Sequence, residues 1–197
     1  MDKLVDRVLK NIFIELEASG RHVHVTKEQA MTLFGHPLTA KRPLSQPGQF
    51  LANERVTVKG PKGEFHNVAV LGPERGDAQV EISLTDGRSL GVTPPVRLSG
   101  DIQNSPGAVL ETDRGRVVLD RGVICAQRHI HITPADAEKF GVKDKDTVRL
   151  QVFTGRPLVF ENVAVRVSDK FATFVHLDYD EANACGFQNG DLGRILK

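Results

Sequence analysis

Two short segments of this chain carry the same pattern of histidines. Residues 21–26 read Arg-His-Val-His-Val-Thr and residues 128–133 read Arg-His-Ile-His-Ile-Thr, so the two copies hold four of the seven histidines. Apolar β-branched residues alternate with the histidines, which is typical of a β-strand. Side chains at positions i and i+2 leave a strand on the same face, about 6–7 Å apart, so each pair of histidines is spaced to bind one metal ion.

The segments that follow the two patterns also repeat. Each pattern leads into a helix-capping signal and a short apolar run, which ends at Gly35 in the first copy and at Gly141 in the second. These signals predict a short helix after each histidine strand. Further on, both copies read Asn-Val-Ala-Val, at 67–70 and again at 162–165. An internal duplication explains this order better than chance does.

A third ligand-type residue occupies the same place in each copy. Fourteen residues after each repeated asparagine stands Glu81 in the first copy and His176 in the second, both flanked by apolar residues. Two sets of three candidate ligands result: His22, His24 and Glu81, and then His129, His131 and His176. Three protein ligands with an open fourth position are the arrangement of a catalytic zinc. Imidazole and carboxylate suit zinc and, less selectively, iron, cobalt or manganese. If the two copies pair, the two sites would form a di-metal centre.

The remaining histidines and cysteines have plainer interpretations. His36 and His66 have no counterpart in the other copy and are expected at the surface. Cys125 lies four residues before His129 and is a possible ligand or nucleophile, although a small buried side chain is the commoner role. Cys185 is expected in the core.

Composition excludes several classes of protein. The chain has 197 residues and a formal net charge of +1 with acidic and basic residues interspersed, so we expect no nucleic-acid partner and no membrane partner. Two cysteines are too few for a disulfide framework. The first twelve residues lack the long apolar core of a signal peptide, so a cytoplasmic protein is expected.

Short strands separated by frequent turn signals predict a mainly β fold made of two small β-barrels from the internal duplication, with two or three short capping helices. The amphipathic spacing of Leu4, Val5, Val8 and Leu9 predicts one of these helices over residues 1–10. It would pack on its own domain or serve as a docking helix. Residues 36–53 read as a loop before a strand at 55–58, and residues 92–119 as a connection with short strands.

Five motifs together resemble a known family. They are R-H-V-H-V-T, Q-V-E-I-S-L-T-D, R-L-S-G-D-I, Q-R-H-I-H-I-T-P-A-D-A and V-H-L-D-Y-D-E-A-N. The chain resembles the PduL-type phosphate acyltransferases found with bacterial microcompartments, from about Leu4 to the C-terminus. The resemblance implies two β-barrels with a di-zinc site between them, and reversible transfer of an acyl group between coenzyme A and phosphate. It also implies domains at 21–125 and 126–197, with the N-terminal segment 1–20 packing on the second.

The resemblance assigns further residues. It implies that the two zinc ions are bound by the two sets of ligands named above, that Arg75 binds phosphate, and that Ser99 is an active-site serine. Coenzyme A contacts fall on Ala18, Ser19, Gly20, Lys62 and Asn183. The family usually has a second basic residue where this chain has Ala69, a departure that bears on one coenzyme A phosphate contact and not on the chemistry. Without the resemblance, Arg75 would be interpreted as an ordinary surface arginine, and Ser99 and Lys62 as ordinary turn residues.

The hypothesis for the reaction is that phosphate, held by the Arg75 fork, attacks the thioester carbonyl directly while one zinc stabilises the departing thiolate. A metal-dependent hydrolase would use the same ligands to activate water, and a non-catalytic barrel would bind zinc structurally. Small-molecule substrates, a homodimer and partners among microcompartment shell or cargo proteins are what the family suggests. Many family members carry a longer N-terminal extension that directs them into a shell, so a place inside a microcompartment stays open here.

Overall fold

The structure, a computed structural model, describes residues 11–196; the helix expected over residues 1–10 lies outside this range. Within it the chain is mainly β, as predicted, with fifteen strands and four short helices. The strands are β1 (Ile14–Ser19), β2 (His22–His24), β3 (Ala40–Pro43), β4 (Phe50–Lys59), β5 (Glu64–Gly72), β6 (Gln79–Glu81), β7 (Val96–Arg97), β8 (Ala108–Glu111), β9 (Arg116–Leu119), β10 (Val123–Ala126), β11 (His129–Ile132), β12 (Thr147–Phe153), β13 (Leu158–Val167), β14 (Phe174–Asp178) and β15 (Leu192–Leu196). The helices are α2 (Lys27–Phe34), α3 (Leu84–Leu90), α4 (Pro134–Phe140) and α5 (Tyr179–Cys185).

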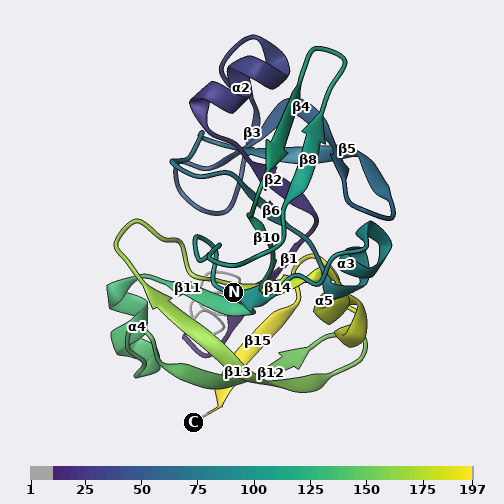
Figure 1. Ribbon diagram of the computed structural model, residues 1–197. Helices are drawn as coiled ribbons and strands as arrows, with labels where there is room; N and C mark the ends of the chain where they lie inside the picture. Colours follow the sequence, from purple (N-terminus) through teal and green to yellow (C-terminus); the bar gives the residue numbers. More distant parts are fainter. Residues whose placement is uncertain (1–10, 197) are drawn as a thin grey trace. The chain divides into compact units, whose positions relative to one another are not determined.

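Two compact units divide the chain. One, which we call the sheet unit, is Gly20–Ala126; the other, the barrel unit, joins the segment that ends at Ser19 to the segment that begins at Gln127. The barrel unit is a closed barrel of strand order β1-β14-β11-β13-β12-β15. The sheet unit is a curled sheet of order β7-β10-β6-β2-β5-β4-β8-β9, with β3 added beside β4 (Figure 1). Both units thus bury their apolar residues on the inside of a curved sheet.

The strand pairing repeats between the units. In the sheet unit β2 pairs in parallel with β5 and antiparallel with β6, and in the barrel unit β11 pairs in parallel with β13 and antiparallel with β14. The strand before each histidine strand is exchanged between the copies. β1 precedes β2 in the chain but pairs with β14, whereas β10 precedes β11 but pairs with β6. The duplication read from the sequence is therefore present in the pairing of the strands.

The repeated Asn-Val-Ala-Val segment has a structural reason. Asn67 and Asn162 have positive φ angles of 56° and 55°, and each lies where the pairing with the neighbouring antiparallel strand shifts register. Asparagine tolerates this left-handed conformation better than most residues do. Two residues later, Ala69 pairs with His22 and Ala164 pairs with His129. The two bulges thus shape the strand beside the first histidine of each pattern.

The helices begin and end at capping residues. Thr26 and Gln29 form a capping box at α2 and Thr133 caps α4, as the sequence predicted. Two further helices, α3 and α5, were not predicted. Each is a seven-residue segment that ends at a glycine in the left-handed region, Gly91 in α3 and Gly186 in α5. These helices are too short for apolar periodicity to reveal them, and their capping residues hold them in place.

The loop expected at 36–53 is only partly irregular. Ala40–Pro43 forms β3 and pairs with the start of β4, which begins at Phe50 and includes the strand expected at 55–58. β3 is an edge strand with every residue exposed, so it lacks the alternation by which strands are recognised in a sequence.

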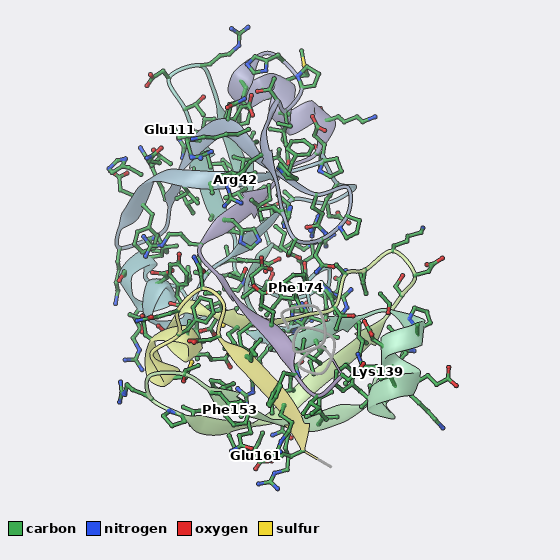
Figure 2. The ribbon with its side chains drawn as sticks, turned by 180° about the vertical axis from the view of Figure 1, so that it is seen from behind. Arg42, Glu111, Lys139, Phe153, Glu161 and Phe174 are labelled. Carbon is green, nitrogen blue, oxygen red and sulfur yellow. The ribbon has the colours of Figure 1, made fainter. Side chains whose placement is uncertain are left out.

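Each unit has its own core of buried aliphatic side chains. The largest fully buried residues include Val23, Leu110 and Ile124 in the sheet unit and Ile130 and Leu150 in the barrel unit. On the barrel wall, Phe153 of β12 and Glu161 of β13 lie on the exposed surface, where Figure 2 labels them. The same strands therefore present one face to the core and the other to solvent.

Candidate metal centres

The first group of candidate ligands lies in the sheet unit. His22 and His24 come from β2 and Glu81 comes from the adjacent antiparallel strand β6. One ligand atom from each residue lies within 4.8 Å of the others. His22 and Glu81 are direct partners across the two strands, and all three side chains are buried. The period of two along β2 and the register with β6 together bring the three donors onto one face.

Backbone carbonyl groups orient the two imidazole rings. The Nδ1 atom of His22 lies 2.8 Å from the Gly20 carbonyl oxygen, and that of His24 lies 3.2 Å from the Leu71 carbonyl oxygen. A carbonyl only accepts, so each Nδ1 carries a hydrogen and donates it. In the neutral rings Nε2 then holds the lone pair, and these Nε2 atoms lie 3.5 Å and 3.8 Å from Glu81 Oε1. This is the usual orientation of a metal-binding histidine.

The pKa values of this group describe a tightly coupled cluster. Burial acts to lower the pKa of His22, but the charge of Glu81 and hydrogen bonds to Glu81 and Gly20 raise it above its ordinary value. Burial and the charges of His22 and Arg75 lower the pKa of His24 well below its ordinary value. Burial acts to raise the pKa of Glu81, but the charges of His22 and His24 outweigh it and lower that pKa strongly. Without a metal, the Glu81 carboxylate and the His22 imidazole therefore favour each other's charged forms.

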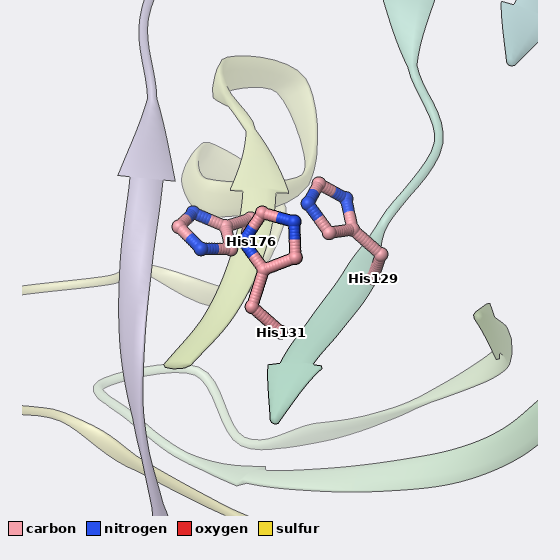
Figure 3. Close-up of side chains that lie close together, drawn as sticks. All are labelled: His129, His131 and His176. Carbon is pink, nitrogen blue, oxygen red and sulfur yellow. The ribbon is translucent and has the colours of Figure 1, made fainter. Parts of the chain in front are cut away.

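The second group lies in the barrel unit. Figure 3 shows His129 and His131 on β11 with their rings gathered beside that of His176 on β14. The candidate ligand atoms again lie within 4.8 Å of one another. His129 Nδ1 lies 2.8 Å from the Gln127 carbonyl oxygen, which repeats the contact between His22 and Gly20. Phe171 stacks on His131 with 4.1 Å between the ring centroids.

A carboxylate lies against the third histidine of this group. Glu17 of β1 is the strand partner of His176, and its Oε2 atom lies 3.4 Å from His176 Nδ1. A carboxylate on the second ring nitrogen makes a histidine a stronger metal ligand. Glu17 was not predicted from the sequence. Its only sequence signal is its place on the exchanged strand, and the exchange itself was expected from the family resemblance alone.

Arg75 and Ser99 lie beside the first group. Ser99 Oγ donates to Glu81 Oε1 at 2.9 Å, and Arg75 donates to Ser99 Oγ at 3.1 Å. The backbone N–H of Arg75 also donates to the carbonyl of Val25, the residue after His24. The positive charge of Arg75 contributes to the lowered pKa of His24. A guanidinium group therefore lies within electrostatic reach of this ligand cluster.

Gln79 is a second residue that sequence reasoning missed. Its amide nitrogen donates to both Glu81 Oε1 and Ser99 Oγ, and its oxygen accepts from the backbone N–H of Gly100. Gln79 stands opposite His24 across β2 and β6 and two residues before Glu81, so it shares the face of the ligands. The spacing of two from Glu81 was the signal that could have found it.

Both groups fit a divalent metal ion. Each offers three donors of the imidazole or carboxylate type, which suit transition metals. The Nδ1 atoms of His22, His24 and His129 contact backbone carbonyls, so the Nε2 atoms are the ones presented to a metal. Three ligands leave one or more coordination positions for a water molecule or a substrate, as at catalytic sites.

The remaining predicted site residues lie in three places. Ala18 and Ser19 pair with the end of β14, and Asn183 is on α5, a helix that contacts β1. Gly20 supplies the carbonyl for His22. Lys62 packs beside the end of α3, and its backbone N–H donates to the Leu90 carbonyl.

The other histidines and the cysteines behave as predicted. The side chains of His36 and His66 are 53% and 70% exposed. Cys125 and Cys185 are both buried. In the part of the chain that the structure describes, every helix is too short or too polar to span a membrane.

Comparison with known proteins gives consistent matches. Residues 15–188 match the model of the phosphate propanoyltransferase family. A phosphate propanoyltransferase from Clostridioides difficile (strain 630) is 52% identical over 199 residues, covering 100% of this chain and 95% of the relative. Proteins of the same name from Listeria monocytogenes and Thermotoga maritima are 50% and 52% identical, covering 100% and 91% of this chain and 93% and 87% of those relatives.

Proposed function

The chain belongs to the phosphate propanoyltransferase family, whose members are acyltransferases, and on this basis we propose that it transfers short acyl groups reversibly between coenzyme A and phosphate. The relatives' name indicates a propanoyl group, and acetyl, one methylene shorter, is an alternative substrate. The proposed cofactors are two zinc ions per chain, one in each group of three ligands. Zinc is the metal that best matches three imidazole or carboxylate donors with an open position.

One observation carries the proposal. Arg75 reaches the ligand Glu81 through a single serine hydroxyl, with hydrogen bonds of 3.1 Å and 2.9 Å. Metal ligands and an anion-binding side chain are thus adjacent in one unit. An arginine fork is well suited to phosphate, because two N–H donors match two phosphate oxygens.

The residues of the chain have distinct tasks in this reaction. Arg75 binds phosphate and orients one oxygen toward the thioester carbonyl carbon, which converts an encounter of two molecules into a reaction within one complex. A new oxygen–carbon bond forms, the carbon–sulfur bond breaks, and coenzyme A leaves as the thiolate. A bound zinc ion supplies Lewis acidity for the developing negative charge. Ser99 and Gln79 keep Glu81 and Arg75 in fixed orientations, so little reorganisation is needed at the moment of reaction.

Phosphate is already a nucleophile near neutral pH, so the proposal requires no covalent acyl-enzyme. Coenzyme A is proposed to contact Ala18, Ser19, Gly20, Lys62 and Asn183. A homodimer, a cytoplasmic location and association with microcompartment shell or cargo proteins complete the proposal. They rest on the resemblance and the family.

The test combines metal analysis with an assay of coenzyme A release from acetyl- and propanoyl-coenzyme A. We expect about two zinc ions per chain, release that depends on phosphate, and loss of activity after chelation. Release of free carboxylate without phosphate would replace the proposal by a metal-dependent hydrolase. Full activity after complete metal removal would show that zinc has no catalytic role.

A further inference from the structure

Each histidine pattern begins with an arginine whose side chain the reaction does not use. Arg21 donates to both carboxylate oxygens of Asp86, with distances of 3.1 Å and 2.7 Å. Arg128 donates to Glu181 at 2.6 Å. Asp86 and Glu181 occupy the same position, the third residue of α3 and of α5, where each also caps its helix. Both copies therefore have the same arginine–carboxylate contact, made with an aspartate in the first copy and with a glutamate in the second.

Each guanidinium group has a second contact that is also repeated. The Arg21 guanidinium carbon lies 4.0 Å from the centre of the Phe65 ring, and that of Arg128 lies 5.7 Å from the centre of the Phe160 ring. Both phenylalanines stand two residues before the repeated asparagine. Each arginine thus connects the histidine strand to a helix and to the strand that bears the bulge.

In each copy the arginine stands in the chain between the first histidine of the pattern and the residue whose carbonyl orients that histidine. Gly20 precedes Arg21 and accepts from His22 Nδ1, and Gln127 precedes Arg128 and accepts from His129 Nδ1. The helix at the other end of each contact starts beside the third ligand: the N-cap of α3 is Ser83, two residues after Glu81. In the barrel unit the N-cap of α5 is Asp178, two residues after His176.

We propose that Arg21 and Arg128 are positioning residues, each of which sets the metal affinity of its own ligand group. The arginine holds two parts of the chain at once: the peptide that presents Nε2 of the first histidine, and the helix that follows the third ligand. The inference rests on metal binding by the two groups as proposed above. Lysine cannot replace the arginine, because it lacks the planar guanidinium group. That group gives two N–H donors to Asp86 in the first copy, and one each to Glu181 and the Glu161 carbonyl in the second.

The test measures zinc affinity for one group at a time in the full chain. In the variant His129→Ala/His131→Ala only the first group is complete, and Zn²⁺ is titrated against a chromogenic chelator. We expect Arg21→Lys to weaken zinc binding there by about tenfold, as the loss of a supporting contact around a metal ligand does. Arg128→Lys is the matched control and should leave this affinity unchanged. In the variant His22→Ala/His24→Ala only the second group is complete. There Arg128→Lys should weaken zinc binding, and Arg21→Lys is the control.

A rescue separates positioning from a general effect on folding. Asp86→Glu introduces the carboxylate that the second copy uses and should keep the affinity, whereas Asp86→Asn removes the charge and should weaken it. With Co²⁺ in place of zinc, Arg21→Lys should also shift the visible absorption bands, which report the geometry of the ligands. A fold that was merely less stable would not shift them.

Two results would overturn the inference: parental zinc affinity in Arg21→Lys, or an equal loss from both arginine variants in the same background. Either can occur while the parent binds two zinc ions normally. If instead neither parental background binds zinc, the proposed metal function fails, and this inference fails with it.

Discussion

His22 of β2 and Glu81 of β6 are directly opposite residues of an antiparallel ladder, with 3.5 Å between Nε2 and Oε1. His129 and His176 have the same relationship across β11 and β14. The two groups share one backbone arrangement, but only the first has a carboxylate. With a bound divalent ion, the ion and its ligands would therefore have a net charge of about +1 in the first group and about +2 in the second. The carboxylate counts as one negative charge and each histidine as neutral.

Glu81→Gln should affect metal binding in the first group and not in the second. The amide has the shape of the carboxylate, but it lacks the charge and its oxygen is a much weaker zinc ligand, so only two good donors remain in the first group. We expect zinc in the first group to be lost or bound at least about tenfold more weakly, while the second group keeps its metal. Metal content after dialysis measures this, with the exposed Glu64→Gln as the control. Two tightly bound ions in Glu81→Gln would remove Glu81 from the site.

Arg75→Ala should raise the Michaelis constant for phosphate sharply with zinc content unchanged, since in the proposed reaction the guanidinium group binds the substrate and not the metal. Arg75→Lys keeps the charge but loses the two-point contact, so an intermediate effect of about tenfold is expected. Initial rates at varied phosphate measure both. The exposed Arg42→Lys is the control, and a phosphate constant equal to that of the parent would exclude Arg75 from phosphate binding.

Gln79→Met should destabilise the protein even without metal. The replacement has a similar shape but leaves the Gly100 N–H without its acceptor and removes one of the two donors to Ser99 Oγ. The expected loss is about 2 kcal/mol in the free energy of unfolding. Urea denaturation with a chelator present measures it, and Gln103→Met at an exposed position is the control. An unchanged midpoint would mean that water replaces these contacts.

At the asparagines of the two bulges, glycine should be tolerated better than alanine. Asn162 is exposed and has a φ angle of 55°, so its side chain matters mainly through the backbone conformation. Asn162→Ala should cost about 1 kcal/mol of stability, whereas Asn162→Gly should cost less or nothing. Thermal unfolding of both variants, and of the same pair at Asn67, tests this. Equal losses for alanine and glycine would show that the asparagine amide itself is needed.

Metal binding to the first group should depend on pH. Its histidines must be neutral to bind a metal, and the raised pKa of His22 means that a proton competes at pH values above the ordinary 6.5. As pH falls through this raised pKa, the apparent zinc affinity should fall by up to about tenfold per pH unit. His24, with its lowered pKa, stays neutral over the same range.

Chelator competition at several pH values, in the variant with only the first group complete, measures this dependence. If the zinc affinity did not change between pH 8 and pH 6, roughly the window in which an imidazole titrates, the prediction would be contradicted. In Glu81→Gln the main cause of the raised pKa is gone, so whatever zinc binding remains should decline at a lower pH than in the parent.

The sequence alone was enough to select the candidate ligands that the structure brings together, because their signals are local. The spacing of two in each histidine pattern places both rings on one face of a strand, and the repeat distance from each asparagine identifies Glu81 and His176. The mainly β class also follows from local alternation and turns. Asn67 and Asn162 were visible as a repeat, although the reason for it, a left-handed bulge, was not.

The tertiary structure alone decided which side chains support the ligands. Gln79, Glu17 and the carboxylates that pair with Arg21 and Arg128 are brought in by strand register, by the exchange of β1 and β10, and by the two short helices. Such contacts join residues far apart in the chain, such as Arg21 and Asp86, which are 65 positions apart. No local pattern encodes them, because their geometry is a property of the packed sheet and not of the segment.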